Sequence, residues 1–260
     1  MKFLPLIFLA ALLVPLPLSA QQPEVLSRNG VPDWEIPEDF RADAFTFARL
    51  RPLIHRRWDV DFPDSDLNFS YRLQEMTSML VNPDPVVVDS LSPNLTDYPF
   101  LYLVEPGTVH LTDEEARVLR EYLLNGGFMM LDDFWGEDEW QNAYHEMKKI
   151  FPDREPVELP IEHPLFHAIF HLEEAPQIPA MEFAVQGRAF GITTQPGGGE
   201  RAIYYGIFDD DGRMMVVICR DTDLGDGWER EGDNAWFFKE FSEKRAYPMG
   251  INIVFHALTH

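Results

Sequence analysis

Carboxylate side chains stand at the ends of two strands that the sequence predicts. Glu105 follows the apolar run 100–104, and Asp132 ends the run 128–132 with Asp133 next to it. The carboxyl ends of parallel strands meet at one edge of a sheet, where ligands of open α/β sheets bind. We therefore expect these carboxylates to lie close together. Like charges held close raise each other's pKa or recruit a cation.

Further acidic residues fall in loops that the same edge would hold. They follow the first predicted strand and a predicted β-hairpin, and they are Asp59, Asp61, Asp64, Asp66, Asp221, Asp223 and Asp226. Hard divalent cations prefer several oxygen ligands, so we expect a calcium or magnesium site. Its predicted ligands are Asp132, Asp133, Asp221 and Asp223. The alternative is that these acids cap helices and form turns.

The segment 221–227 resembles the opening of a calcium-binding EF-hand loop. One residue too many separates its second and third acids, Asp223 and Asp226, and no glutamate follows at the position of the bidentate ligand. The spacing therefore does not specify an EF-hand.

Two functions fit this arrangement. The one we favour is a domain that binds a small molecule, a glycan or an envelope protein, in a pocket that includes Asp132 and Asp133. The other residues expected to line that pocket are Asp64, Asp66, Asn68, Glu105 and Trp135. The alternative is a hydrolase of envelope glycan or another polar polymer. In it, Asp132 or Asp133 is the general base or a metal ligand, and a second carboxylate is the acid.

The charge of the chain narrows the choice of partners. Its 44 acidic residues against 21 Lys and Arg give a formal net charge of −23. Such a surface repels phosphate backbones and anionic lipid, so we do not expect nucleic acid as a partner.

The first 20 residues have the features of a signal peptide. Lys2 precedes an uncharged apolar run, 3–18, and the small residue Ala20 stands at the expected cleavage site. The run is shorter than the roughly 20 residues that cross a membrane, and it contains three prolines. We expect a secreted protein, periplasmic or extracellular, with no transmembrane segment in the remaining chain.

Residues 21–43 have scattered prolines and charges and predict an N-terminal arm, and residues 44–260 predict one domain. Strands are predicted at 45–50, 85–89, 100–105 and 128–132, and helices at about 65–80, 112–124 and 138–151. Ser65 or Asp66 is expected to cap the first helix, and Thr112 with Glu115 forms a capping box on the second. This alternation predicts an α/β fold of three layers, in which helices cover both faces of a mostly parallel sheet.

The second half of the chain is less regular. Strands 203–208 and 213–219 flank an Asp-Gly turn and predict a β-hairpin. A Gly-rich loop is expected at 186–200, and helices at 235–244 and 250–260.

The runs 95–101 and 123–133 resemble the class I glutamine amidotransferase-like fold, a flavodoxin-like arrangement. In that fold, a strand after a Gly-Gly turn ends at a sharp elbow that carries a nucleophilic cysteine. Asp133 takes the place of that cysteine here, and the only cysteine of the chain is Cys219. The resemblance therefore implies the fold with a degenerate site, since an aspartate cannot perform amide thiolysis.

The runs 64–69, 71–73, 132–136 and 247–252 resemble a bacterial family, domain of unknown function 4159. This resemblance covers roughly residues 44–260. It implies the same amidotransferase-like fold and a location outside the cytoplasm, and it implies no particular activity.

Overall fold

The computed structural model describes residues 28–191 and 194–260. The predicted signal peptide and the first residues of the predicted arm lie outside the described residues. Within the described part, no helix combines the length and the apolar character that a membrane crossing requires.

The described residues form a sheet of seven strands in the order β2-β1-β3-β4-β7-β6-β5. The strands are β1 (Ala48–Arg51), β2 (Val86–Asp89), β3 (Phe100–Val104), β4 (Phe128–Asp132), β5 (Val157–Glu158), β6 (Ile203–Phe208) and β7 (Met214–Arg220). The first five in this spatial order are parallel, β6 is antiparallel to β7, and β5 is antiparallel to β6. The sheet is therefore mostly parallel and doubly wound, with the predicted hairpin at one side.

The α-helices are α1 (Asp64–Met76), α2 (Asp113–Leu124), α3 (Gly136–Ile150), α4 (Met181–Gly187), α5 (Leu224–Glu229), α6 (Ala235–Phe237) and α7 (Tyr247–Thr259). A π-helical segment, η6 (Phe238–Ala246), joins α6 to α7. The short 3-10 turns are η1 (Glu38–Asp43), η2 (Leu95–Asp97), η3 (Pro106–Thr108), η4 (Pro164–His167) and η5 (Arg188–Phe190).

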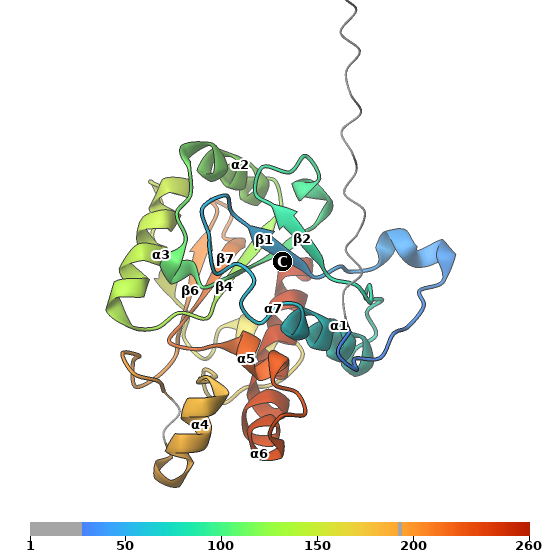
Figure 1. The fold of residues 1–260 in the computed structure, drawn as a ribbon. Helices are drawn as coiled ribbons and strands as arrows, with labels where there is room; N and C mark the ends of the chain where they lie inside the picture. The colour runs from blue at the N-terminus through green and yellow to red at the C-terminus, as the bar shows by residue number, and fades with distance from the viewer. Residues whose placement is uncertain (1–27, 192–193) are drawn as a thin grey trace, which may run out of the picture.

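Helices cover both faces of the sheet, which confirms the three-layer α/β prediction. Helices α1, α5 and α7 lie on one face, and α2 and α3 lie on the other (Figure 1). Residues of β3 alternate between the faces: Tyr102 packs with the α1 side and Leu103 with the α2 side. Every residue of β3 and β4 is buried, as expected of central parallel strands.

The predicted helix caps and helix ends agree with the structure for α2 but not for α1. The capping box of α2 is confirmed, because Thr112 Oγ1 accepts from the Glu115 N–H and the Glu115 carboxylate accepts from the Thr112 N–H. The predicted cap of α1 is wrong: the helix begins at Asp64, one residue before Ser65. Its end also comes at Met76 instead of 80, because the chain leaves the helix in extended conformation at Thr77.

The arm differs from a free linker in the part that the structure describes. Trp34 Nε1 donates to the Val81 carbonyl at 2.7 Å, and the Arg28 guanidinium donates to the Pro83 carbonyl at 2.9 Å. Asn29 donates to the Asp64 carboxylate at the start of α1. The arm is thereby fixed beside α1.

A buried ion pair joins β1 to α1. Arg49 and Asp66 are both fully buried, and Arg49 Nε donates to Asp66 Oδ1 at 3.0 Å. The same guanidinium donates to the carbonyls of Trp58 and Val60 at 3.0 and 2.7 Å. Arg49 therefore positions both the helix and the loop 52–63 that precedes it.

Replacing Arg49 by Met is expected to lower the free energy of unfolding by about 3–5 kcal/mol, because it leaves the Asp66 carboxylate buried without a counter-charge. Urea unfolding followed by circular dichroism measures the difference. The double variant Arg49→Met/Asp66→Leu should recover part of the loss. A single variant within about 1 kcal/mol of the wild type would contradict this role.

Candidate functional site

Three strands are each followed directly by an acidic residue whose backbone is left-handed. Glu105, Asp133 and Asp221 directly follow β3, β4 and β7, with φ of 49°, 60° and 59°. Asp61, in the loop after β1, has φ of 62°. Positive φ is uncommon in residues other than glycine, and such strained positions cluster at ligand sites. The carboxyl edge of the sheet therefore has the backbone features of a functional site as well as its charge.

Asp61, Asp133 and Asp223 form the first of two carboxylate groups. Each offers one oxygen, and these oxygens lie within 4.8 Å of one another. The residues come from the loop before α1, the end of β4 and the N-cap of α5. The Asp223 side chain is held in place because its Oδ1 accepts from the backbone N–H of Asp226 at 2.7 Å. The fold thus brings together three carboxylates that are far apart in the sequence.

A second group consists of Asp61, Asp226 and Glu229, again with oxygens within 4.8 Å of one another. Arg230 neutralises part of it, since its Nε lies 2.7 Å from Glu229 Oε2 and 3.2 Å from Asp226 Oδ1. Asp61 belongs to both groups and links them into one cluster.

The arginines whose charges act on the first group have other partners. The positive charge of Arg49 lowers the pKa of Asp61, but Arg49 forms its ion pair with Asp66. Arg57 attracts Asp133 electrostatically, but it forms its ion pair with Glu105. The negative charge of the first group is therefore less well compensated than that of the second.

Among the described residues, one buried oxygen of the first carboxylate group lacks a hydrogen-bond partner. Asp61 Oδ2 is buried and accepts no hydrogen bond among the described residues. Leaving a buried carboxylate oxygen unpaired is costly, so this oxygen requires either a proton on the carboxyl group or a bound ligand. Gly225 keeps the space beside it open, because a Cβ at this position would lie 2.8 Å from both Asp61 Oδ2 and the Tyr102 hydroxyl oxygen.

Asp132 lies beneath the cluster and is fully buried. Its Oδ2 accepts from the Tyr102 hydroxyl at 3.1 Å and from the Gly225 N–H at 3.0 Å. Burial nevertheless raises the pKa of Asp132 to about 7, and the backbone N–H of Leu224 and Gly225 opposes that rise.

The pKa values of the neighbouring carboxyl groups are raised as well. Burial, and then repulsion from neighbouring carboxylates, raises the pKa values of Asp61, Asp133 and Asp223 well above the ordinary range. Burial also raises the pKa of Glu105, against the effect of Arg57, and raises that of Glu229 to about 7, against the effect of Arg230. These carboxyl groups can lose their protons together only if a cation compensates them.

The structure brings only some of the predicted site residues together. Asp133 and Asp223 belong to the first carboxylate group, and Asp132 and Glu105 act electrostatically on it. Asp221, predicted as a metal ligand, instead accepts from the Gly136 N–H at 2.8 Å and pairs with Arg220.

The remaining predicted residues lie elsewhere. Asp66 is in the ion pair with Arg49, whereas Asp64 and Asn68 line a neighbouring surface pocket. Trp135 is buried under the Gly-rich loop, where a Cβ on Gly198 would lie 2.4 Å from its ring. The Trp135 ring is therefore not exposed at the surface, and its predicted role in binding a ligand stays a prediction.

The sequence places Asp61 and Asp226 at this edge of the sheet but not among the predicted ligands, and it does not single out Glu229. Asp226 and Glu229 are three residues apart, which places them on one face of a helix, and this spacing was an available signal. No spacing distinguishes Asp61 from the other acids of its loop, because its position depends on the path of the loop that Arg49 holds.

Comparison with known families identifies the chain. A family model described as Domain of unknown function (DUF4159) matches residues 46–258, so the chain belongs to this family. A comparison with curated proteins found no match.

The raised pKa values predict that, with divalent cations chelated, the protein is more stable at pH 5 than at pH 7.5. Unfolded carboxyl groups titrate near pH 4, so between about pH 4 and 7 the folded state binds more protons and stability falls as pH rises. Asp132 alone contributes up to about 1.4 kcal/mol per pH unit in this range. Thermal unfolding in EDTA at both pH values measures the effect.

The variant Asp132→Asn should show a smaller difference in melting temperature between the two pH values. The same difference in the wild type and in Asp132→Asn would mean that Asp132 is not protonated in the folded protein at pH 5.

Proposed function

We propose that the protein is a ligand-binding domain that works outside the cytoplasm and holds a divalent cation at Asp61, Asp133 and Asp223. The observation that carries this proposal is the buried, unpartnered Asp61 Oδ2 within a group of three carboxylates. The location rests on the signal-peptide features of residues 1–20.

Calcium or magnesium fits the donor set best. Both carboxylate groups contain only Asp and Glu oxygens, which hard cations prefer, whereas zinc favours imidazole and thiolate. A cation here would stabilise the ionised carboxylates that burial disfavours. It would also leave coordination positions for a ligand, because three side chains provide fewer oxygens than either ion takes.

We also propose that the domain has the glutamine amidotransferase-like form of the doubly wound sheet. The left-handed Asp133 directly after β4 supports an elbow at the position of the nucleophile. An aspartate there suits cation binding and not amide thiolysis, so the site would have exchanged covalent chemistry for ligand binding.

A metal-assisted hydrolase of envelope glycan or another polar polymer is the second candidate. The observation that favours it is the pKa of about 7 at Asp132 and Glu229. Such a value suits a general base near neutral pH, which would take a proton from water while the cation polarises the bond to be cleaved.

Addition of calcium or magnesium is expected to raise the melting temperature. Stabilisation should grow by about 1.4 kcal/mol for each tenfold rise in cation concentration above the dissociation constant. The variant Asp61→Asn/Asp133→Asn should show no such response, because it removes two of the three ligands. The exposed hairpin residue Asp211 supplies the control, and Asp211→Asn should respond like the wild type.

A flat response of the wild type to calcium, magnesium and manganese would contradict the cation site. So would an unchanged response of the double variant, because the stabilising ion would then bind elsewhere.

The hydrolase candidate predicts turnover of glycan or ester substrates that requires the cation. Asp132→Asn should lower the rate by about 10²-fold or more through loss of the base. Release of reducing ends or of a chromogenic ester group measures it. Equal rates in the wild type and in Asp132→Asn would exclude Asp132 as the base.

A further inference from the structure

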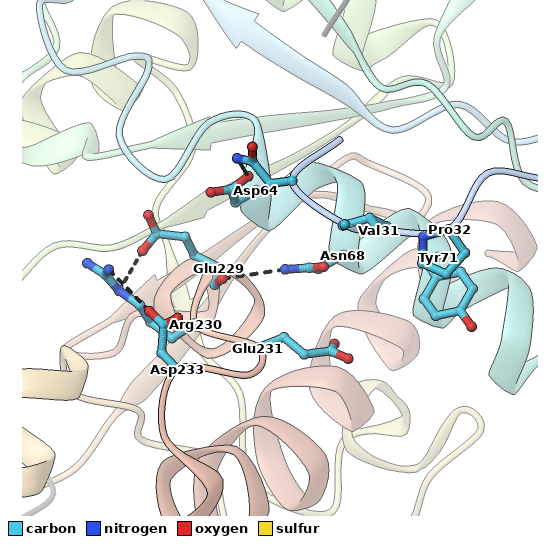
Figure 2. Close-up of a pocket in the computed structure, with 11 residues that line it drawn as sticks. Val31, Pro32, Asp64, Asn68, Tyr71, Glu229, Arg230, Glu231 and Asp233 are labelled. Carbon is cyan, nitrogen blue, oxygen red and sulfur yellow. Dashed lines mark hydrogen bonds and ion pairs between the residues drawn. The ribbon is translucent and has the colours of Figure 1, made fainter. Parts of the chain in front are cut away.

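A surface pocket of about 420 Å³ lies between the arm, α1 and the end of α5 (Figure 2). Its carboxylates pair with groups of the protein: Asp64 with Asn29, Glu229 and Asp233 with Arg230, and Glu231 with Arg72. The acids of this pocket are therefore already engaged. Imidazole groups at the last turn of α7 are a different case.

Two histidines lie one helical turn apart at the end of α7. His256 and His260 are four residues apart, and their rings stack with centroids 4.5 Å apart. The backbone N–H of His260 donates to the His256 carbonyl at 3.1 Å, so one helical turn includes both residues. Histidines at this spacing share one face of a helix, which is how paired histidines bind a transition metal.

Hydrogen bonds fix the position of the proton on His260. The Thr259 hydroxyl donates its only proton to the Phe255 carbonyl at 2.7 Å, and the same oxygen lies 2.9 Å from His260 Nδ1. Because the hydroxyl proton is already used, the hydrogen bond to His260 requires a proton on Nδ1. In the neutral ring, His260 Nε2 therefore presents its lone pair, as in a metal-binding histidine whose other nitrogen is held by a hydrogen bond.

The ring of His256 is buried but incompletely engaged. Among the described residues, its Nδ1 has no hydrogen-bond partner, although the residue is only 5% exposed. Burial, and then the nearby rings of His260 and His163, lower the pKa of His256 to about 4. His256 is therefore neutral at pH 7 and keeps a lone pair for a ligand.

A third imidazole, that of His163, lies beside the pair without belonging to it. Its ring centroid is 5.7 Å from that of His256, but its Nδ1 accepts from the Leu165 N–H in η4. Burial, and then His260, lower the pKa of His163. At neutral pH, His163 therefore adds no positive charge that would repel a cation from the pair.

The surroundings of the pair favour a cation. Helix α7 ends at Thr259, and the carbonyl groups in the last turn of a helix carry partial negative charge. The formal net charge of −23 attracts cations to the protein in addition. Both effects favour a metal ion at the end of α7.

We propose that His256 and His260 chelate a divalent transition-metal cation, and that copper(II) binds there more tightly than nickel or zinc. Imidazole nitrogens suit these cations, whereas the carboxylate group at the sheet edge suits calcium or magnesium. The exposed ring of His260 turns so that its Nε2 and a nitrogen of His256 meet one ion, and water fills the remaining positions. This site is independent of the cation site proposed at the sheet edge.

Isothermal titration of the purified protein, without a histidine tag, with copper(II) chloride tests this proposal. His260→Gln should weaken copper binding by at least about tenfold, because one of two linked ligands is lost. His260 is exposed, so this variant should fold like the wild type, which circular dichroism checks. The exposed His145 of α3 supplies the matched control, and His145→Gln should bind copper like the wild type.

A second variant separates this site from the carboxylate cluster. Asp61→Asn/Asp133→Asn should keep the copper affinity of the wild type, and its electron paramagnetic resonance spectrum should show coupling of copper to two nitrogens. Equal affinity in the wild type and in His260→Gln overturns the inference. A spectrum of oxygen ligands alone, or loss of copper binding in Asp61→Asn/Asp133→Asn, also overturns it, because the ion would then bind at carboxylates.

Discussion

The structure depends on the crowding of buried carboxylates at the carboxyl edge of its sheet. Asp61, Asp133 and Asp223 lie close together with little exposure to water, and burial and mutual repulsion raise their pKa values, which disfavours their ionisation at the same time. The charge can be removed by protons or balanced by a cation. Our proposal is that a divalent cation balances the charge at neutral pH, because one ion compensates several carboxylates at once.

Several features of the fold position these carboxylates. All residues of the central strands β3 and β4 are buried, so these strands hold the acidic residues that follow them in fixed positions. Arg49 holds the loop of Asp61 through two carbonyls and holds α1 through Asp66. Gly225 leaves the volume between Asp61 and Tyr102 open. Of the left-handed residues after the strands, Asp133 contributes its carboxylate to the cluster, whereas Asp221 accepts from the Gly136 N–H and Glu105 pairs with Arg57.

The sequence predicted the regular part of this structure well, because periodic burial and capping are local properties. The strand 128–132 and the capping box at Thr112 are found where the pattern indicated. The start of α1 differs from the prediction because Arg49, a contact remote in sequence, engages Asp66, which the sequence offers as a cap.

The candidate site was harder to predict than the fold. Carboxylates at the ends of strands could be read from the sequence, and Asp133 and Asp223 do come together. The sequence could not show that Asp221 accepts from the Gly136 N–H at the start of α3 while Asp61 enters the cluster, since both outcomes depend on loop conformation. Glu229 joins the cluster only because α5 packs against α1, a tertiary contact without a local signature.

The most direct measurement is the anomalous difference density of crystals soaked in manganese, which replaces calcium or magnesium at oxygen sites. The account predicts a peak among the oxygens of Asp61, Asp133 and Asp223, with the ion in contact with Asp61 Oδ2. No peak at this position, or a peak only at other acidic residues of the surface, would show that the buried cluster is held by protons and is not a cation site.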